Sequence, residues 1–144
     1  MRCDEVMKRD VVSVTPDDSV QEAAQLMREE NIGFIPVCDQ DNKVIGTITD
    51  RDIAIRLVAS NKSASTSVRD IMSHELVAVR PADDLSEAER QMVTHHKSRI
   101  VCTDDMGRLE GVISLSDIAQ AEGRSLTGQV LREVTEREAT PGPY

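Results

Sequence analysis

Two segments of the sequence carry hydroxyl and carboxyl groups at the same spacing. Residues 46–54 read Gly-Thr-Ile-Thr-Asp-Arg-Asp-Ile-Ala, and residues 111–119 read Gly-Val-Ile-Ser-Leu-Ser-Asp-Ile-Ala. An ionised carboxylate accepts several hydrogen bonds at once and can hold a vicinal diol. The N-terminus of a helix that directly follows a strand presents free N–H groups and a positive dipole end, which suit a phosphate. The residues that match this chemistry are Thr49 and Asp52 in the first segment, and Ser114 and Asp117 in the second.

The same spacing also has a purely structural interpretation. A Thr or Ser at the N-cap with an acidic residue three positions later forms a capping box, which stabilises the start of any helix. For a single occurrence capping is the simpler explanation. Recurrence of the pattern after a glycine, inside a longer repeat, favours a ligand site in at least one copy, and the same residues can serve both purposes.

The unit around each segment is repeated as a whole. Residues 6–54 align with residues 71–119 without a gap, at an offset of 65 positions. A unit of about 60 residues buries only about 60% of the surface that its unfolded chain exposes, so neither copy is expected to be stable alone. We therefore expect the two copies to share one core, as repeated supersecondary units do.

Hydrophobic periodicity, capping boxes and turn residues predict the same elements in each copy, while strand order and register stay open. The predicted elements of the first copy are a lead-in helix 3–8, a strand 11–14, a helix starting at the capping box of Ser19 and Glu22, strands 34–37 and 43–49, and a closing helix 50–59. Those of the second copy are 67–72, 76–79, a helix starting at Asp84 and Glu87, strands 99–102 and 108–114, and a closing helix 115–122.

Composition limits the function classes. The formal charge of -9 argues against a nucleic-acid surface, which requires basic residues to neutralise phosphates. No apolar run approaches the roughly 20 residues of a membrane span, and the N-terminus lacks the apolar core of a secretory signal. We therefore expect a cytoplasmic protein. The three cysteines have no Cys-x-x-Cys spacing, so they are interpreted as buried free thiols, with a redox or metal-sensing role as the weaker alternative.

The repeated order strand, helix, strand, strand, helix, closing on Gly-x-x-Thr/Ser-x-x-Asp, resembles the cystathionine-β-synthase-like (CBS) domain pair from about Val6 to Ala119. The resemblance implies an α+β fold in which two tandem β-α-β-β-α repeats pack as a pseudo-two-fold pair, a stand-alone Bateman module. The expected divisions are a first repeat 1–60, a linker 61–66, a second repeat 67–123, a C-terminal helix 124–138 and a disordered tail 139–144.

The resemblance also implies a function. Such pairs bind AMP, ADP, ATP or S-adenosylmethionine in two clefts between the repeats, form homodimers, and regulate a partner protein rather than catalyse a reaction. By motif position, Asp52 and Asp117 would bind ribose, while Thr49 and Ser114 would approach the phosphate. No catalytic cofactor, catalytic residue or metal site is expected.

Charge and apolar character suggest further ligand contacts. The phosphate of the ligand needs cations or donors on this acidic protein, and the adenine must be held by aliphatic groups because the sequence has one Phe and one Tyr. The candidates near the phosphate are Arg51, Ser116, Arg80 and Arg99, and the candidates near adenine are Ile35, Pro36 and Ile100. Val101 stands where this family usually has a proline, so the two sites are expected to differ in affinity.

Three functions remain to be compared. The leading hypothesis is a regulatory sensor that binds an adenine nucleotide or S-adenosylmethionine and acts through an effector protein. The alternative is a dimerisation or interaction module with vestigial ligand clefts. An enzyme is disfavoured, because the sequence contains no P-loop, no Gly-x-Ser-x-Gly and no metal-ligand spacing.

Overall fold

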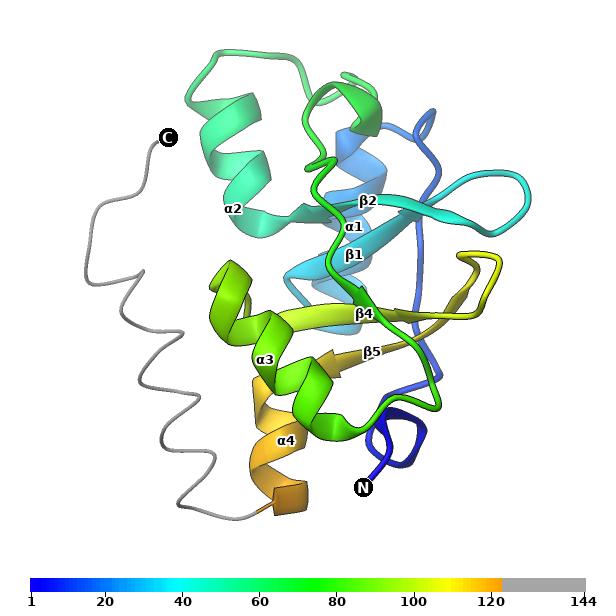
Figure 1. Ribbon diagram of the computed structural model, residues 1–144. Coiled ribbons are helices and arrows are strands. Elements are labelled where there is room, and N and C mark those ends of the chain that lie inside the picture. Colours follow the sequence, from blue (N-terminus) through cyan, green and yellow to red (C-terminus); the bar gives the residue numbers. More distant parts are fainter. Residues whose placement is uncertain (123–144) are drawn as a thin grey trace. The chain divides into compact units, whose positions relative to one another are not determined.

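The computed structural model describes residues 1–122, and the C-terminal helix and tail expected over 124–144 lie outside the described residues (Figure 1). The chain divides into two compact units. We call residues Val12–Leu76 the Thr49 unit, and Met1–Val11 together with the described residues from Val77 onward the Ser114 unit. Within residues 1–122 no helix combines the length and apolar character that a membrane crossing requires.

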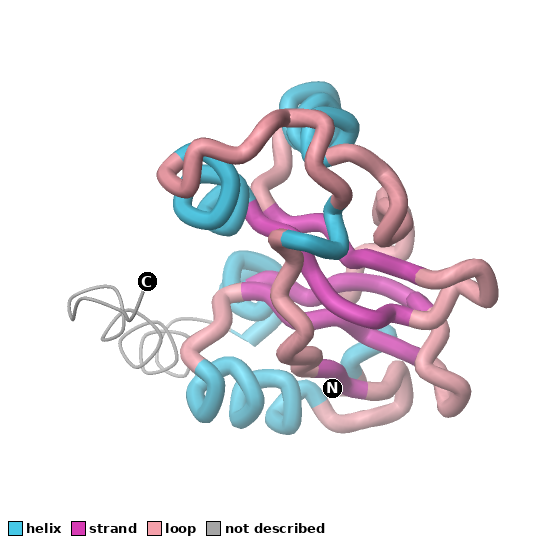
Figure 2. Tube along the Cα trace, turned by 90° about the horizontal axis from the view of Figure 1, so that it is seen from above, coloured by secondary structure: helices cyan, strands magenta, loops and turns pink. Residues whose placement is uncertain are grey.

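The Thr49 unit contains a two-stranded antiparallel sheet and its helices (Figures 1 and 2). Phe34 lies opposite Thr49 in the strand pairing. The elements are α1 (Val20–Glu30), β1 (Phe34–Cys38), β2 (Val44–Thr49), α2 (Asp50–Asp52), the π-helix η2 (Ile53–Val58) and the 3-10 helix η3 (Val68–Asp70).

Helix α1 begins where the capping box predicted it. The Ser19 hydroxyl accepts a hydrogen bond from the Glu22 N–H at 3.1 Å, and the Glu22 carboxylate accepts one from the Ser19 N–H at 3.2 Å. The N–H groups of Val20 and Gln21 donate to carbonyls of the linker, at Thr66 and Ala64. The linker expected over 61–66 is therefore tied to the first turn of α1.

The Ser114 unit contains a three-stranded sheet in the order β3-β4-β5, parallel between β3 and β4 and antiparallel between β4 and β5. The Asp84 carboxylate caps α3 by accepting from the Ser86 N–H at 3.1 Å, whereas Glu87 binds Arg90 instead of completing a capping box. The elements are the 3-10 helix η1 (Cys3–Glu5), β3 (Ala78–Val79), α3 (Leu85–His95), β4 (Arg99–Thr103), β5 (Leu109–Ser114) and α4 (Leu115–Glu122).

Several predicted elements differ from the structure. The lead-in helix 3–8 is only the single 3-10 turn η1. The strand 11–14 is reduced to one parallel bridge between Val14 and Val37, and the strand 76–79 to the two residues of β3. The closing helix 50–59 is interrupted, because its second part, η2, is a π-helix.

Each lead-in segment pairs with the closing strand of the other sequence repeat. Lys8, at the start of the first repeat, forms two backbone hydrogen bonds with Val112 on β5, at 2.9 and 3.0 Å. Ser73, at the start of the second repeat, forms the equivalent pair with Thr47 on β2, at 2.8 and 3.0 Å. The two repeats therefore exchange their lead-in segments.

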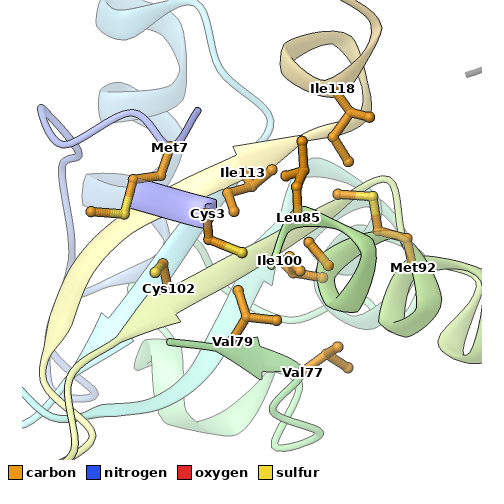
Figure 3. Packing of buried hydrophobic residues seen from close by; sticks show 11 residues of the cluster. Cys3, Met7, Val77, Val79, Leu85, Met92, Ile100, Cys102, Ile113 and Ile118 are labelled. Carbon is orange, nitrogen blue, oxygen red and sulfur yellow. The ribbon is translucent and has the colours of Figure 1, made fainter. Parts of the chain in front are cut away.

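This exchange determines how the buried residues are grouped. Instead of one core common to both copies, the described residues form two clusters, and each cluster includes residues from both sequence repeats. In the Ser114 unit, Figure 3 shows Cys3 and Met7 from the lead-in segment among residues of β3, α3, β4, β5 and α4. The Thr49 unit has the matching arrangement, with Val68, Ile71 and Met72 in its cluster.

The glycine of each motif is required by the exchanged segment. A Cβ atom at Gly46 would lie 2.5 Å from the Ser73 carbonyl oxygen, and one at Gly111 would lie 2.6 Å from the Lys8 carbonyl oxygen. Real Cβ atoms do not approach backbone oxygens so closely, so a side chain at either position would push the lead-in segment off the strand.

Gly46→Ala and Gly111→Ala are therefore expected each to lower the free energy of unfolding by about 1–3 kcal/mol, the usual cost of overpacking. Chemical denaturation followed by circular dichroism measures this. The control is Gly107→Asn, because a Cβ at Gly107 meets nothing within 4 Å and the first repeat has Asn42 there with a φ of 62°. Equal losses in all three variants would contradict the close-approach argument.

Candidate ligand sites at the two strand–helix junctions

At the first junction, Thr49 and Asp52 form a complete capping box. The Asp52 N–H donates to the Thr49 hydroxyl at 3.1 Å, and the Thr49 N–H donates to Asp52 Oδ2 at 2.9 Å. Asp52 is only 4% exposed although it carries a charge. The capping interpretation is thus observed, and it leaves Asp52 Oδ1 as the carboxylate oxygen that is not used by the cap.

Arg56 approaches that second oxygen. Its Nε lies 3.8 Å from Asp52 Oδ1, and its Nη1 donates to the carbonyls of Ile71 at 3.2 Å and Met72 at 3.1 Å. Arg56 therefore links the buried carboxylate to the exchanged lead-in segment of the same unit. Buried carboxylates generally require such a partner, because desolvation penalises an isolated charge.

At the second junction, Ser114 and Asp117 repeat the cap. The Asp117 N–H donates to the Ser114 hydroxyl at 3.1 Å, and the Ser114 N–H donates to Asp117 Oδ2 at 2.9 Å. The hydroxyls of Ser114 and Ser116 lie 2.9 Å apart. Here the cation near Oδ1 is Lys8, with Nζ at 3.6 Å, and it comes from the exchanged segment rather than from the helix.

Of the arginines predicted near the phosphate, Arg99 is the one that the sheet places beside a motif residue. It lies directly opposite Ser114 in the β4–β5 pairing, where side chains are neighbours. Arg80 donates through Nη1 to the Asp104 carbonyl at 2.7 Å and to the Asp105 carboxylate at 2.9 Å, so it holds the β4–β5 turn. Arg51 follows Asp50 on the exposed side of α2.

The residues predicted near adenine are buried in their strands. Ile35 is 0% and Ile100 1% exposed, each within the cluster of its own unit, and Pro36 is also buried. Val101, the departure from the family pattern, is fully buried as well. These side chains pack the core, so an adenine contact by them stays a prediction.

Lys8 and Arg56 were missed by the sequence reasoning. Neither has a basic counterpart at the offset of 65, since Ser73 corresponds to Lys8 and Ala121 to Arg56. A search for the residues shared by the two copies therefore passes over both. The signal that could have found them is a basic residue that is present in only one of the two copies.

An open groove lies beside the second carboxylate. It is widely open to solvent and has a volume of about 410 Å³. Its lining combines apolar surface with polar groups from the lead-in segment and from α4. The described residues that line it are Met1, Glu5, Val6, Asp117, Gln120 and Ala121.

The three cysteines are buried free thiols, as predicted. Burial, with smaller contributions from nearby acidic groups, raises the pKa of Cys3 to about 11 and that of Cys102 to about 12. Burial also raises the pKa of Cys38. Among the described residues, no group of three or more His, Cys, Asp or Glu side chains is placed to hold a metal ion.

A model of the CBS domain matches residues 3–59 and 68–124, and the chain therefore belongs to the CBS domain family. It is 38% identical over 115 residues to the CBS domain-containing protein YhcV of Bacillus subtilis, covering 80% of this chain and 81% of that protein. The resemblance inferred from the doubled motif is thus confirmed, as is the mixed α and β fold with two tandem CBS repeats.

Two solved structures share the fold. The CBS domain pair of protein MJ0100, in complex with 5'-methylthioadenosine and S-adenosyl-L-methionine, matches with a TM-score of 0.76 and 23% identity, over 84% of this chain and 94% of that chain. CBSX2 in complex with AMP matches with a TM-score of 0.72 and 23% identity, over 83% of this chain and 94% of that chain. At this identity the likeness concerns the fold alone.

Arg56→Ala is expected to lower the free energy of unfolding by about 1–3 kcal/mol, because it leaves a buried carboxylate and two carbonyls without a charged donor. Thermal or urea unfolding measures the loss. Lys43→Ala, on the exposed β1–β2 turn, is the control and should change stability by less than about 0.5 kcal/mol. If the Arg56 variant is as stable as this control, the hydrogen bonds to Ile71 and Met72 contribute nothing measurable to the free energy of unfolding.

Alkylation of the native protein at pH 8 is expected to be slow. A thiol reacts as its thiolate, and a pKa of about 11 leaves Cys3 roughly one part in a thousand ionised at that pH. Mass spectrometry after timed iodoacetamide treatment should show labelling at least about a hundredfold slower in native than in unfolded protein. Rapid native labelling of Cys3 or Cys102 would contradict the burial and revive the thiol-sensing alternative.

Proposed function

We propose that this protein is a regulatory sensor that binds an adenosine-containing ligand at its Thr49–Asp52 and Ser114–Asp117 junctions. One observation carries the proposal. Each junction holds a carboxylate in a fixed orientation through one oxygen, while the other oxygen lies near a cation. A carboxylate oxygen with a nearby positive charge is suited to a ribose diol together with a phosphate.

The relatives support this choice of ligand class. MJ0100 is a CBS domain pair in complex with 5'-methylthioadenosine and S-adenosyl-L-methionine, and CBSX2 is in complex with AMP. In our proposal Asp52 and Asp117 bind the ribose, and Thr49, Ser114, Ser116, Arg51 and Arg99 lie near the phosphate. Adenine packs near Ile35, Pro36 and Ile100, and Arg80 contributes charge from the β4–β5 turn.

The remaining parts of the proposal concern action rather than binding. The protein acts without catalysis, as a homodimer in the cytoplasm, and passes the ligand signal to an effector protein. Three buried thiols are compatible with that reducing compartment. The alternative is a dimerisation or interaction module with vestigial ligand clefts, in which the motif residues serve only as the helix caps seen at both junctions.

The two candidates separate by substitution at the aspartates. If Asp52 and Asp117 bind ribose, alanine at either position should abolish AMP or S-adenosylmethionine binding at that site, measured by isothermal titration. If they only cap, alanine should cost about 0.5–2 kcal/mol of stability and leave binding unchanged. Ser19→Ala is the matched control, since it removes the capping box of α1 at a similar cost away from both motifs.

A second measurement identifies the ligand directly. With no Trp and a single Tyr, the protein absorbs weakly at 280 nm, so a copurified adenine compound would dominate the spectrum near 260 nm. Denaturation followed by mass spectrometry would name it. An empty preparation that shows no thermal shift with AMP, ADP, ATP or S-adenosylmethionine would favour the interaction module.

A further inference from the structure

The two junctions share a scaffold but hold different cations beside their carboxylates. Asp52 faces Arg56, one turn further along its own helix, and the residue of the exchanged segment is Ser73. Asp117 faces Lys8, which is the residue of the exchanged segment, and the position equivalent to Arg56 is Ala121. Each carboxylate thus has one cation, supplied from a different part of the unit.

The two cations differ in how firmly they are held. Arg56 contacts Asp52 and donates to two backbone carbonyls, so a ligand could recruit it only by breaking those bonds. The Lys8 side chain is 73% exposed, and its Nζ lies 3.6 Å from Asp117, too far for a strong hydrogen bond. Because Lys8 itself is largely exposed, solvent weakens its pairing with the Asp117 side chain, which is 11% exposed, and Lys8 can turn to another anion at modest cost.

The residues that lie opposite the two motif hydroxyls in the sheets also differ in charge. Arg99 lies opposite Ser114, whereas Phe34 lies opposite Thr49. Directly after the motif hydroxyl, the first junction has the carboxylate of Asp50 and the second has the apolar Leu115. An anionic ligand group at the second junction therefore has Lys8 and Arg99 nearby, whereas at the first junction Arg51 and Arg56 are accompanied by an aromatic ring and an extra carboxylate.

The groove of about 410 Å³ gives a ligand room next to Asp117. The side chains of Met1, Val6 and Ala121 supply apolar surface there. Glu5 also lines the groove, but its Oε2 accepts the Arg2 N–H at 2.6 Å, which directs that oxygen toward the backbone. Because Asp117 is part of this lining, a ligand in the groove can contact the carboxylate that Lys8 approaches.

We propose that Lys8 makes the Ser114–Asp117 site selective for phosphate-bearing adenine nucleotides over uncharged or cationic adenosine compounds. On binding, the Lys8 ammonium leaves Asp117 for the phosphate, and the freed carboxylate oxygen accepts the ribose hydroxyls. The Thr49–Asp52 site has Ser73 in the place of Lys8, and it discriminates less between AMP and adenosine. This inference rests on the proposed function, because it assigns the ligand class of one of its two sites.

The test compares AMP, adenosine and S-adenosylmethionine by isothermal titration. Lys8→Ser copies the residue of the other repeat and keeps both backbone hydrogen bonds to Val112. The background is Asp52→Ala, which leaves only the second site, or Asp52→Asn if alanine prevents folding. We expect Lys8→Ser to weaken AMP by at least about tenfold, the loss of one charge-assisted contact, while adenosine is unchanged or slightly tighter.

Two controls make the outcome specific. Lys43→Ser removes a lysine from an exposed turn of the Thr49 unit and should leave all three affinities unchanged in that background. In the reciprocal Asp117→Ala background, Lys8→Ser should leave the ratio of AMP to adenosine affinity unchanged. Equal weakening of AMP and adenosine by Lys8→Ser, or no weakening of AMP, would overturn the inference while leaving the proposed function intact. Absence of binding by any adenosine compound to the unaltered protein would instead refute the proposed function.

Discussion

The architecture depends on one close approach of backbone to backbone. In each unit the exchanged lead-in segment lies so near the closing strand that only glycine fits at Gly46 and Gly111. Paired hydrogen bonds at Thr47 and Val112 then fix the segment beside the strand, two residues before the motif hydroxyl. The residue of the lead-in segment that forms these hydrogen bonds, Lys8 or Ser73, therefore lies near the end of the strand where the helix starts. That is how Lys8 comes to face Asp117 although 109 positions separate them in the sequence. The glycine of the motif therefore serves the fold directly and the site indirectly.

The motif aspartates can cap their helices and still bind the ligand that we propose, because a carboxylate has two oxygens. One oxygen of Asp52 or Asp117 accepts the N–H of the motif hydroxyl residue and completes the cap. That bond fixes the rotamer, so the other oxygen already points in a defined direction before any ligand arrives. Binding then costs less conformational entropy than it would with a free side chain. Evidence that these residues cap their helices is consequently no argument against ligand binding.

Local patterns in the sequence predicted the elements that local interactions determine. The Ser19 capping box located α1, and the apolar runs located β1, β2, β4 and β5 to within about two residues. The strand expected over 11–14 failed because its partner is a single bridge to Val37, and pairing is a property of the neighbour, not of the segment. The exchange of lead-in segments could not be predicted from the sequence either. Both segments carry the same residue pattern, so the pattern does not indicate which closing strand each one joins. Lys8 and Arg56 were missed for a related reason: their partners are set by that exchange and by the helix turn, not by adjacent residues.

An exact repeat tends to give two equal sites, so differences between them must come from positions that the repeat does not constrain. The buried positions and the glycines are fixed by packing in both units, which leaves the exposed residues around the carboxylate free to differ.

Arg56 lies in a π-helix, whereas Ala121 occupies the equivalent position in the regular helix α4. A π-turn widens the helix and is frequent at functional sites. In the Thr49 unit the cation is thus supplied by the helix and tied to the lead-in segment, and in the Ser114 unit it is supplied by the lead-in segment itself. The charge of the two motif carboxylates is thus met in two ways, one rigid and one movable, and in our proposal the movable cation, Lys8, responds to the phosphate of a ligand.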